Sequence, residues 1–169
     1  NGTINLLELA NRLKIKNIIF ISTLQVYGQE LEGIYSENSP LNCQSPYALN
    51  HFLGEEICKY YFKNKGLNVL ILRPSNVFGV PDSKSTDRST LVPICFVKEI
   101  MASEKINIKS SGKQMRNFIS NNQLSDIILS LIDAFPKGLN YINAVSNYNE
   151  EIRKVAELTK EIYFNIFQK

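Results

Sequence analysis

Two short apolar segments constrain the fold of this chain more than any other feature. Residues 17–22 (NIIFIS) and 67–73 (LNVLILR) have the length of strands and the continuous apolar character of strands buried on both faces, as in parallel sheets. Between them, Ser45 and Pro46 can start a helix, because serine caps the first turn and proline tolerates the first helical position. This helix is predicted to end near Gly66. Strand, helix and strand in this order predict a parallel sheet with a right-handed crossover.

The remaining segments are predicted from apolar periodicity and from clusters of turn residues. They complete an α/β chain without an internal repeat. They are a helix at 4–13, an ordered loop at 27–45, a second loop at 81–90, a helix at 91–101, a strand at 105–109, a helix at 122–134, a strand at 139–144 and a helix at 149–164.

Composition excludes several classes of partner. The chain has 19 Lys and Arg against 16 Asp and Glu, and the net charge of +3 is too small to favour a nucleic acid or an anionic membrane as a partner. No apolar run approaches the roughly 20 residues that span a bilayer. The three cysteines, Cys43, Cys58 and Cys95, are odd in number and widely spaced. We therefore expect no disulfide framework, and a reducing cytoplasm as the compartment.

Composition also excludes two kinds of site. His51 is the single histidine, so a multi-histidine metal site is excluded and we expect no metal. The eight glycines are never closer than five residues apart, so the chain contains no G-x-G-x-x-G, and no Walker loop to hold phosphates is present either.

Polar side chains gather where the two predicted strands end and where the helix between them begins. The three clusters are residues 22–28 (STLQVYG), 47–51 (YALNH) and 73–79 (RPSNVFG). In doubly wound sheets, ligands bind at the carboxyl ends of the strands. The hydroxyl of Thr23 and the phenol of Tyr47 would form a proton-handling pair at this edge.

Several motifs, in the same order along the chain, carry a family resemblance. They are GTINLLELA, STLQVYG, SPYALNH, RPSNVFG and GKQMRNFI. This set resembles the extended short-chain dehydrogenase/reductases, and within them the NAD-dependent epimerase/dehydratase group that acts on nucleotide sugars. The resemblance implies part of a doubly wound, Rossmann-type sheet with a small substrate-binding lobe. Residues 1–80 would be the remainder of the nucleotide-binding domain, and residues 81–169 the lobe, with a strand near 139–144 returning to the sheet.

The resemblance also implies roles for residues at the sheet edge. Tyr47 stands where the family has its acid/base tyrosine, and Thr23 where a hydroxyl binds the substrate oxygen and relays the proton. His51 stands where the family has a lysine, one helical turn from the tyrosine. Ser22 and Pro74 match positions beside the cofactor, which for the family is NAD or NADP.

Four further positions match substrate contacts of the family. Asn76 matches a ligand-facing polar residue, and Leu91 and Pro93 match a segment beside the nucleotide base. Arg116 matches an arginine that clamps the diphosphate, for which a planar guanidinium is well suited. The expected partner is therefore a nucleotide sugar, with the sugar, the nucleotide and the choice between NAD and NADP left open.

The chain departs from the family pattern in four places. The glycine-rich half would precede residue 1, so we expect the chain alone to hold NAD weakly. His51 supplies no fixed positive charge when neutral, and Asn117 replaces an aspartate. Leu24 and Gln25 replace the Asp-Glu pair of the 4,6-dehydratases, and neither can act as a general acid. An epimerase or a keto-sugar reductase is therefore expected rather than a dehydratase.

Two alternatives to an enzyme follow from the same features. The missing cofactor half and His51 are also compatible with a non-catalytic remnant or binding module of the same fold. The apolar surfaces of the helices at 2–13 and 47–64 exceed what one face needs, and by resemblance these helices would form a homodimer. A protein–protein scaffold unrelated to sugars would rest on these helices alone.

Overall fold

The computed structural model describes residues 2–29, 31, 33–80 and 90–167. The predicted loop at 81–90 lies almost wholly outside the described residues. The chain divides into two compact units. The first unit contains residues 1–75 and 123–145, and the second contains residues 76–122 and 146–169. Both units are therefore built from segments far apart in the sequence.

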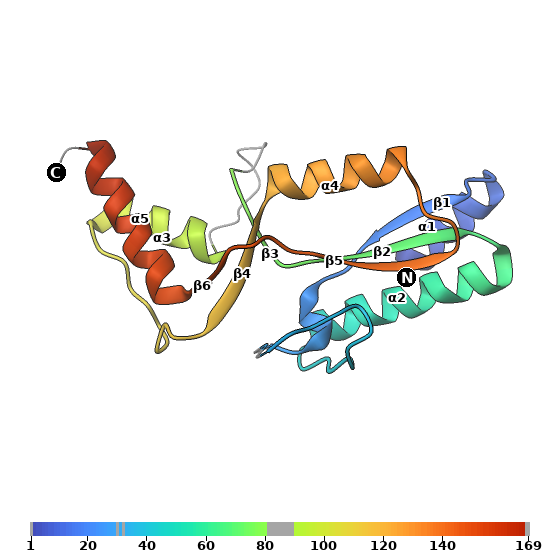
Figure 1. Ribbon diagram of the computed structural model, residues 1–169, viewed down its shortest axis with the longest axis horizontal. Helices are drawn as coiled ribbons and strands as arrows, with labels where there is room; N and C mark the ends of the chain where they lie inside the picture. The colour runs from blue at the N-terminus through green and yellow to red at the C-terminus, as the bar shows by residue number, and fades with distance from the viewer. Residues whose placement is uncertain (1, 30, 32, 81–89, 168–169) are drawn as a thin grey trace. The chain divides into compact units, whose positions relative to one another are not determined.

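A parallel three-stranded sheet forms the centre of the first unit (Figure 1). Its order is β1 (Asn17–Ile21), β2 (Asn68–Pro74), β5 (Leu139–Ala144), with β2 in the middle. β1 pairs with β2 from Asn17 opposite Asn68, and β2 pairs with β5 from Val69 opposite Leu139. Every residue of β2 after Asn68 is buried. The predicted α/β class and its parallel strands are confirmed.

Two helices cover one face of this sheet. α1 (Gly2–Arg12) and α2 (Pro46–Lys65) join the strands in one apolar core. Figure 1 places α4 (Asn121–Asp133) on the opposite side of the sheet from α2. The first core contains Leu7, Cys58, Tyr61, Leu67, Val69 and Ile71.

The residues from which the ends of α2 were predicted also form its caps. The hydroxyl of Ser45 accepts a hydrogen bond of 3.1 Å from the backbone N–H of Ala48, and Pro46 follows in the first turn. Gly66 ends the helix with a φ of 66°, a left-handed conformation that glycine adopts without strain. Capping therefore fixes where Tyr47 stands, at the start of α2.

The second unit combines three short strands with two helices. β4 (Met115–Ser120) pairs in parallel with β3 (Asn76–Phe78) and antiparallel with β6 (Asn149–Glu151). α3 (Val92–Ser103) packs against α5 (Ile152–Phe167). Their shared core contains Phe96, Phe118, Ile152, Val155 and Ala156.

Two predictions in this unit are wrong. Residues 105–109 are not a strand: Ile106 and Ile108 pack against the core of α3 and α5, and the backbone N–H of Asn107 donates to Glu99 at 2.8 Å. The alternation there arises from packing against helices. The helix predicted at 149–164 begins instead at Ile152, because residues 149–151 pair with β4. Among the residues that the structure describes, no helix is both long and apolar enough to cross a membrane.

Candidate functional site

The carboxyl edge of the first unit's sheet carries three of the residues singled out from the sequence. Ser22 and Thr23 follow β1, and Pro74 is the last residue of β2. Thr23 is only 7% exposed, and its hydroxyl oxygen accepts a hydrogen bond of 3.2 Å from the backbone N–H of Gln25. It thereby caps the short 3-10 helix η1 (Leu24–Tyr27). A hydroxyl has one donor and two acceptor sites, so this cap leaves its O–H able to donate.

Tyr47 and His51 lie side by side on the first turns of α2. The two ring centroids are 4.5 Å apart in an edge-on arrangement, and the Tyr47 side chain is 52% exposed. The ring of Phe20 lies 6.5 Å from that of His51. Nδ1 of His51 is buried and has no hydrogen-bond partner among the described residues. The phenol is therefore reachable from solvent, beside an imidazole nitrogen with unused hydrogen-bonding capacity.

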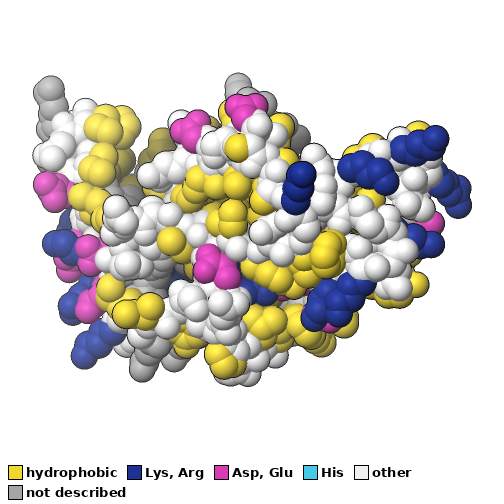
Figure 2. All heavy atoms as spheres, turned by 45° about the vertical axis from the view of Figure 1, so that its right-hand side comes forward, with side chains coloured by type: hydrophobic (Ala, Val, Ile, Leu, Met, Phe, Trp, Pro, Cys, Tyr) yellow, Lys and Arg dark blue, Asp and Glu magenta, His cyan; other side chains and the backbone are white. Residues whose placement is uncertain are grey.

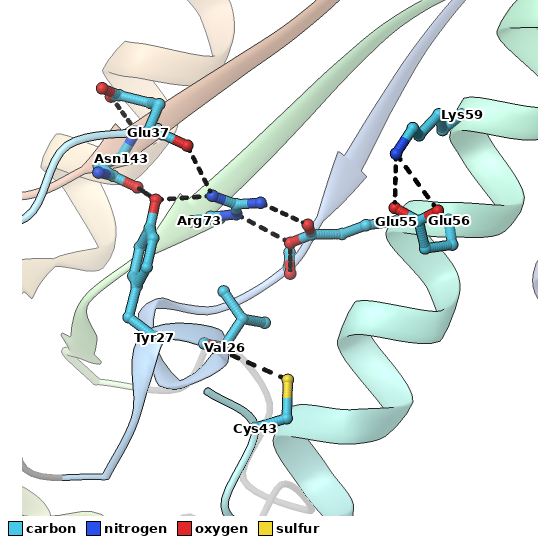
Figure 3. Close-up of polar contacts among 10 residues, drawn as sticks. Val26, Tyr27, Glu37, Cys43, Glu55, Glu56, Lys59, Arg73 and Asn143 are labelled. Carbon is cyan, nitrogen blue, oxygen red and sulfur yellow. Dashed lines mark hydrogen bonds and ion pairs between the residues drawn. The ribbon is translucent and has the colours of Figure 1, made fainter. Parts of the chain in front are cut away.

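A buried ion pair lies at the same edge of the sheet. The Arg73 side chain binds the Glu55 carboxylate twice, with Nη2 2.6 Å from Oε2 and Nε 3.0 Å from Oε1 (Figure 3). The hydroxyl of Ser22 donates to Oε1 of Glu55 at 2.5 Å. Glu55, Arg73 and Ser22 are at most 2% exposed. The candidate cofactor residue Ser22 therefore directs its hydroxyl at Glu55.

The other side of the Arg73 guanidinium contacts an aromatic and polar group of residues. Its Nη1 donates to the phenol oxygen of Tyr27 at 2.6 Å, and that phenol donates to Oδ1 of Asn143 at 2.9 Å. The guanidinium lies 5.0 Å from the ring of Tyr27 and 4.8 Å from that of Tyr141, within range of cation–π attraction. Glu37 accepts from the backbone N–H of Asn143 at 2.8 Å, which ties the 27–45 loop to β5.

Burial and neighbouring charges both shift the pKa values of groups in this structure. Burial alone lowers the pKa of Arg73, but the hydrogen bonds and charge of Glu55, with help from Tyr27, raise that pKa above its ordinary value. Burial, followed by the charge of Glu55, raises the pKa of Cys58 to about 12. Burial also raises the pKa values of Cys43 and Cys95. All three thiols thus favour the protonated, less reactive form.

Sequence reasoning missed the roles of Glu55, Arg73, Tyr27 and Asn143. One signal was present: Arg73 ends an apolar run predicted to be buried, and a buried cation needs a partner. The partner could not be identified from the sequence, because Glu55 is one of two adjacent glutamates on α2. Its neighbour Glu56 forms an exposed pair with Lys59 at 3.0 Å.

The second unit contains a pocket of about 470 Å³ between α3, the 107–110 segment and the start of β4. Arg116 lines it, as do Lys109 and Glu99, and Oε1 of Gln114 is buried without a hydrogen-bond partner in the described part of the chain. The remaining lining residues are Thr90, Val92, Cys95, Phe96, Asn107, Ile108, Ser110 and Ile152. The pocket thus combines apolar walls with two cations and the carboxylate of Glu99.

The other substrate residues singled out from the sequence take different places in this unit. Leu91 is the residue that precedes α3 and Pro93 lies in its first turn, whereas Val92, between them, lines the pocket. The side-chain amide of Asn76 donates to the backbone oxygen of Asn117 at 2.8 Å. Asn76 is exposed and retains its side-chain oxygen for a ligand.

Asn117 makes contacts that an aspartate could not make. Its side-chain N–H₂ donates to the backbone oxygen of Ser146 at 2.8 Å and to Oδ1 of Asn149 at 2.9 Å, and its Oδ1 accepts from the N–H of Ser146 at 3.2 Å. A carboxylate has no hydrogen to donate to the two oxygens. The departure from the family pattern is therefore matched by local hydrogen bonding that joins β4 to the 146–149 segment.

Comparison with known proteins identifies the family. The family model described as the NAD dependent epimerase/dehydratase family matches residues 1–144. A putative UDP-glucose 4-epimerase of Methanocaldococcus jannaschii is 34% identical over 119 residues, which are 70% of this chain and 38% of that protein. A human dTDP-D-glucose 4,6-dehydratase is 28% identical over 161 residues, which are 95% of this chain and 43% of that protein.

Solved structures agree with the sequence comparisons. The UDP-glucuronic acid 4-epimerase of Bacillus cereus, in complex with UDP-glucuronic acid and NAD, superposes with a TM-score of 0.86 and 25% identity. The match covers 95% of this chain and 50% of that enzyme. The chain thus spans about half the length of the proteins it resembles, or less. It belongs to the NAD-dependent epimerase/dehydratase family, as the order of its motifs predicts.

Proposed function

We propose that the protein containing this chain is an NAD-dependent enzyme that epimerises a nucleotide sugar or reduces its keto form. The observation that carries the proposal is the half-exposed phenol of Tyr47 beside His51, on the first turns of the helix that follows Thr23. The nucleotide-sugar relatives favour an enzyme over a non-catalytic remnant of the fold.

Tyr47 acts as the acid/base in this proposal. Its phenolate oxygen takes the proton from a sugar hydroxyl when the carbon bearing that hydroxyl is oxidised, and returns it when the carbon is reduced. The hydroxyl of Thr23 donates a hydrogen bond to the same sugar oxygen. One of its two acceptor sites is occupied by the N–H of Gln25, and its O–H stays able to donate to the ligand.

The described residues fit the nicotinamide end of the cofactor. Two buried polar atoms at this edge, Nδ1 of His51 and Oγ of Ser75, have no hydrogen-bond partner within the described ranges. A ribose hydroxyl and a carboxamide would satisfy such atoms. Bound NAD would supply the two-electron oxidant. Ser22 and Pro74 flank this position, although the Ser22 hydroxyl already donates to Glu55.

His51 sits one turn after Tyr47, where the family has a lysine. A protonated imidazole would stabilise a neighbouring phenolate by charge, whereas a neutral imidazole offers hydrogen bonding alone. We infer that the side chain at position 51 affects how well Tyr47 works as a base. Changing His51 to lysine should place a fixed cation beside Tyr47 and raise turnover.

The nucleotide part of the substrate is assigned to the pocket of the second unit. Arg116 and Lys109 would bind the diphosphate, and the apolar wall beside Val92 would hold the base. Leu91 and Pro93 position Val92, and Asn76 would contact the sugar. Leu24 and Gln25, in η1, carry no acid for water elimination, so we favour epimerisation or keto reduction over dehydration.

Epimer formation tests this function. The full-length protein is incubated with NAD and UDP- or GDP-sugars, and epimers are followed by NMR; a keto sugar with NADPH tests reduction. Turnover that falls by about 10²–10⁴-fold in Tyr47→Phe is the expected result. Inactivity toward every sugar, unchanged in Tyr47→Phe, would instead favour a binding module.

A homodimer is the proposed assembly. Hydrophobic side chains reach the surface of the molecule in several places (Figure 2). Leu6 and Leu9 on α1, and Leu13 directly after it, are each more than half exposed. On α2, Leu49 and Leu53 are each 48% exposed. Such an apolar helix surface usually has a partner. Sedimentation of the full-length protein measures the assembly, and Leu9→Glu should favour the monomer.

A further inference from the structure

We propose that the buried Glu55–Arg73 pair positions Thr23, so that its hydroxyl keeps a fixed place relative to the phenol of Tyr47. This inference rests on the proposed function. Neither charged residue is exposed enough to touch a substrate, since Glu55 is 1% and Arg73 2% exposed. Their effect on a reaction must therefore pass through the residues that they hold.

The first link joins the strand end that carries Thr23 to the helix that carries Tyr47. Ser22 directly precedes Thr23, and its hydroxyl donates to Glu55 at 2.5 Å. Glu55 lies on α2, the helix whose first turn contains Tyr47. This hydrogen bond therefore couples the backbone beside the hydroxyl to the helix that bears the phenol.

The second link holds the segment after Thr23. Arg73 binds both oxygens of Glu55 and donates from Nη1 to the phenol of Tyr27 at 2.6 Å. Tyr27 ends the 3-10 helix that Thr23 caps. Thr23 is thus bracketed by Ser22 on one side and Tyr27 on the other, and both are bound by the same ion pair.

The physical properties of the pair suit positioning better than stability. Burying two charges has a large desolvation cost, and well-packed apolar residues often give equal or greater stability. A bidentate guanidinium–carboxylate pair instead fixes both side chains in one plane. Because a displacement of about 1 Å in a reacting group can lower a rate by about a hundredfold, such rigidity affects turnover directly.

Adjacent glutamates on α2 provide a matched test in the full-length enzyme. Glu55→Gln removes the charge that binds Arg73, whereas Glu56→Gln removes the same charge from an exposed pair with Lys59. We expect Glu55→Gln and Ser22→Ala to lower kcat by about 10–100-fold, with KM changed by less than about twofold. Glu56→Gln should leave both constants unchanged.

A stability control separates positioning from general loosening of the fold. Leu67 is buried in the apolar core and directly precedes β2. Arg73 lies near the other end of this strand. Leu67→Val should lower the Tm without lowering kcat. If Leu67→Val lowers kcat as much as Ser22→Ala does at equal loss of Tm, the positioning role is overturned. Equal kcat losses in Glu55→Gln and Glu56→Gln would overturn it as well.

A readout without turnover distinguishes this inference from the proposed function. A 3-fluorotyrosine placed at position 47 reports the surroundings of that ring by ¹⁹F NMR. Glu55→Gln and Ser22→Ala should shift or broaden the resonance, and Glu56→Gln should leave it unchanged. An unmoved resonance in all three variants overturns the positioning role, even when the wild-type enzyme turns over. A shifted resonance in a protein without sugar activity supports the coupling while rejecting the proposed function.

Discussion

Two arginines, one in each unit, show how the same side chain serves different purposes. Arg73 is the penultimate residue of the buried strand β2 in the first unit and is 2% exposed, with its guanidinium bound to Glu55 and Tyr27. Arg116 lies on β4 of the second unit, is half-buried, and lines a pocket of about 470 Å³ together with Lys109. The first is enclosed by protein groups, whereas the second borders a cavity that can admit a ligand.

This difference in burial suggests a structural role for Arg73 and a ligand-binding role for Arg116. A guanidinium that is fully desolvated must be satisfied by its own protein, because an unpaired buried charge is strongly destabilising. A guanidinium at a pocket wall can bind phosphate oxygens when a ligand enters the pocket. Changes at Arg73 should therefore appear mainly in stability and positioning, and changes at Arg116 mainly in ligand affinity.

The largest expected effect is that of Arg73→Met. It leaves Glu55 buried without a cation, so the free energy of unfolding should fall by about 3–5 kcal/mol. Urea denaturation of the full-length protein measures the loss. The double variant Glu55→Leu/Arg73→Met should recover much of it, because no buried charge is left unpaired. A loss below about 1 kcal/mol in the single variant would mean that water reaches the carboxylate and that the contrast with Arg116 fails.

Arg116→Ala should weaken the binding of a nucleoside diphosphate by about 10–100-fold, since hydrogen bonds to a charged group contribute about 1.5–3 kcal/mol. Calorimetry with UDP, GDP and dTDP measures the dissociation constants and ranks the bases. Arg116→Lys keeps the charge but loses the planar fork, so it should recover only part of the affinity. An unchanged dissociation constant in Arg116→Ala would remove the diphosphate from this pocket.

Asn117→Asp tests the uncharged hydrogen bonds of Asn117 in the second unit, for comparison with the charged Glu55–Arg73 pair of the first. It removes two donated hydrogen bonds, to the backbone of Ser146 and to Asn149, at about 0.5–1.5 kcal/mol each. The resulting loss of about 1–3 kcal/mol should be smaller than that of Arg73→Met. Hydrogen exchange should rise at residues 146–149 and stay unchanged in β1 and β2. Faster exchange throughout the first unit would contradict this local role.

The smallest effect is expected for Lys59→Ala. Its ion pair with Glu56 is solvent-exposed on both sides, and such pairs contribute about 0.3–0.5 kcal/mol at helix spacing. Denaturation at low and at high salt measures it, and the small difference should vanish as salt screens the pair. A loss comparable to that of Arg73→Met would erase the distinction between buried and exposed pairs on α2.

The order and type of the elements in the first unit could be predicted because their signals are local. Continuous apolar runs identified β1 and β2, and Ser45, Pro46 and Gly66 identified both ends of α2. The second unit was harder, because β3 and β6 are three residues each and have no period of their own. Residues 105–109 alternate between apolar and polar like a strand but pack against helices. The alternation alone cannot distinguish a strand from an extended segment packed on helices.

The sequence by itself determined the family and the parallel strands. It also placed Tyr47 after a helix cap and Thr23 after a strand end, since these features depend on neighbouring residues. Only the tertiary structure decided which of two adjacent glutamates is buried, that Arg73 bridges Glu55 and Tyr27, and that Val92 lines the pocket between Leu91 and Pro93. The reason is physical: burial and pairing depend on which distant segments meet in space, and a sequence records only the order in which those segments are joined.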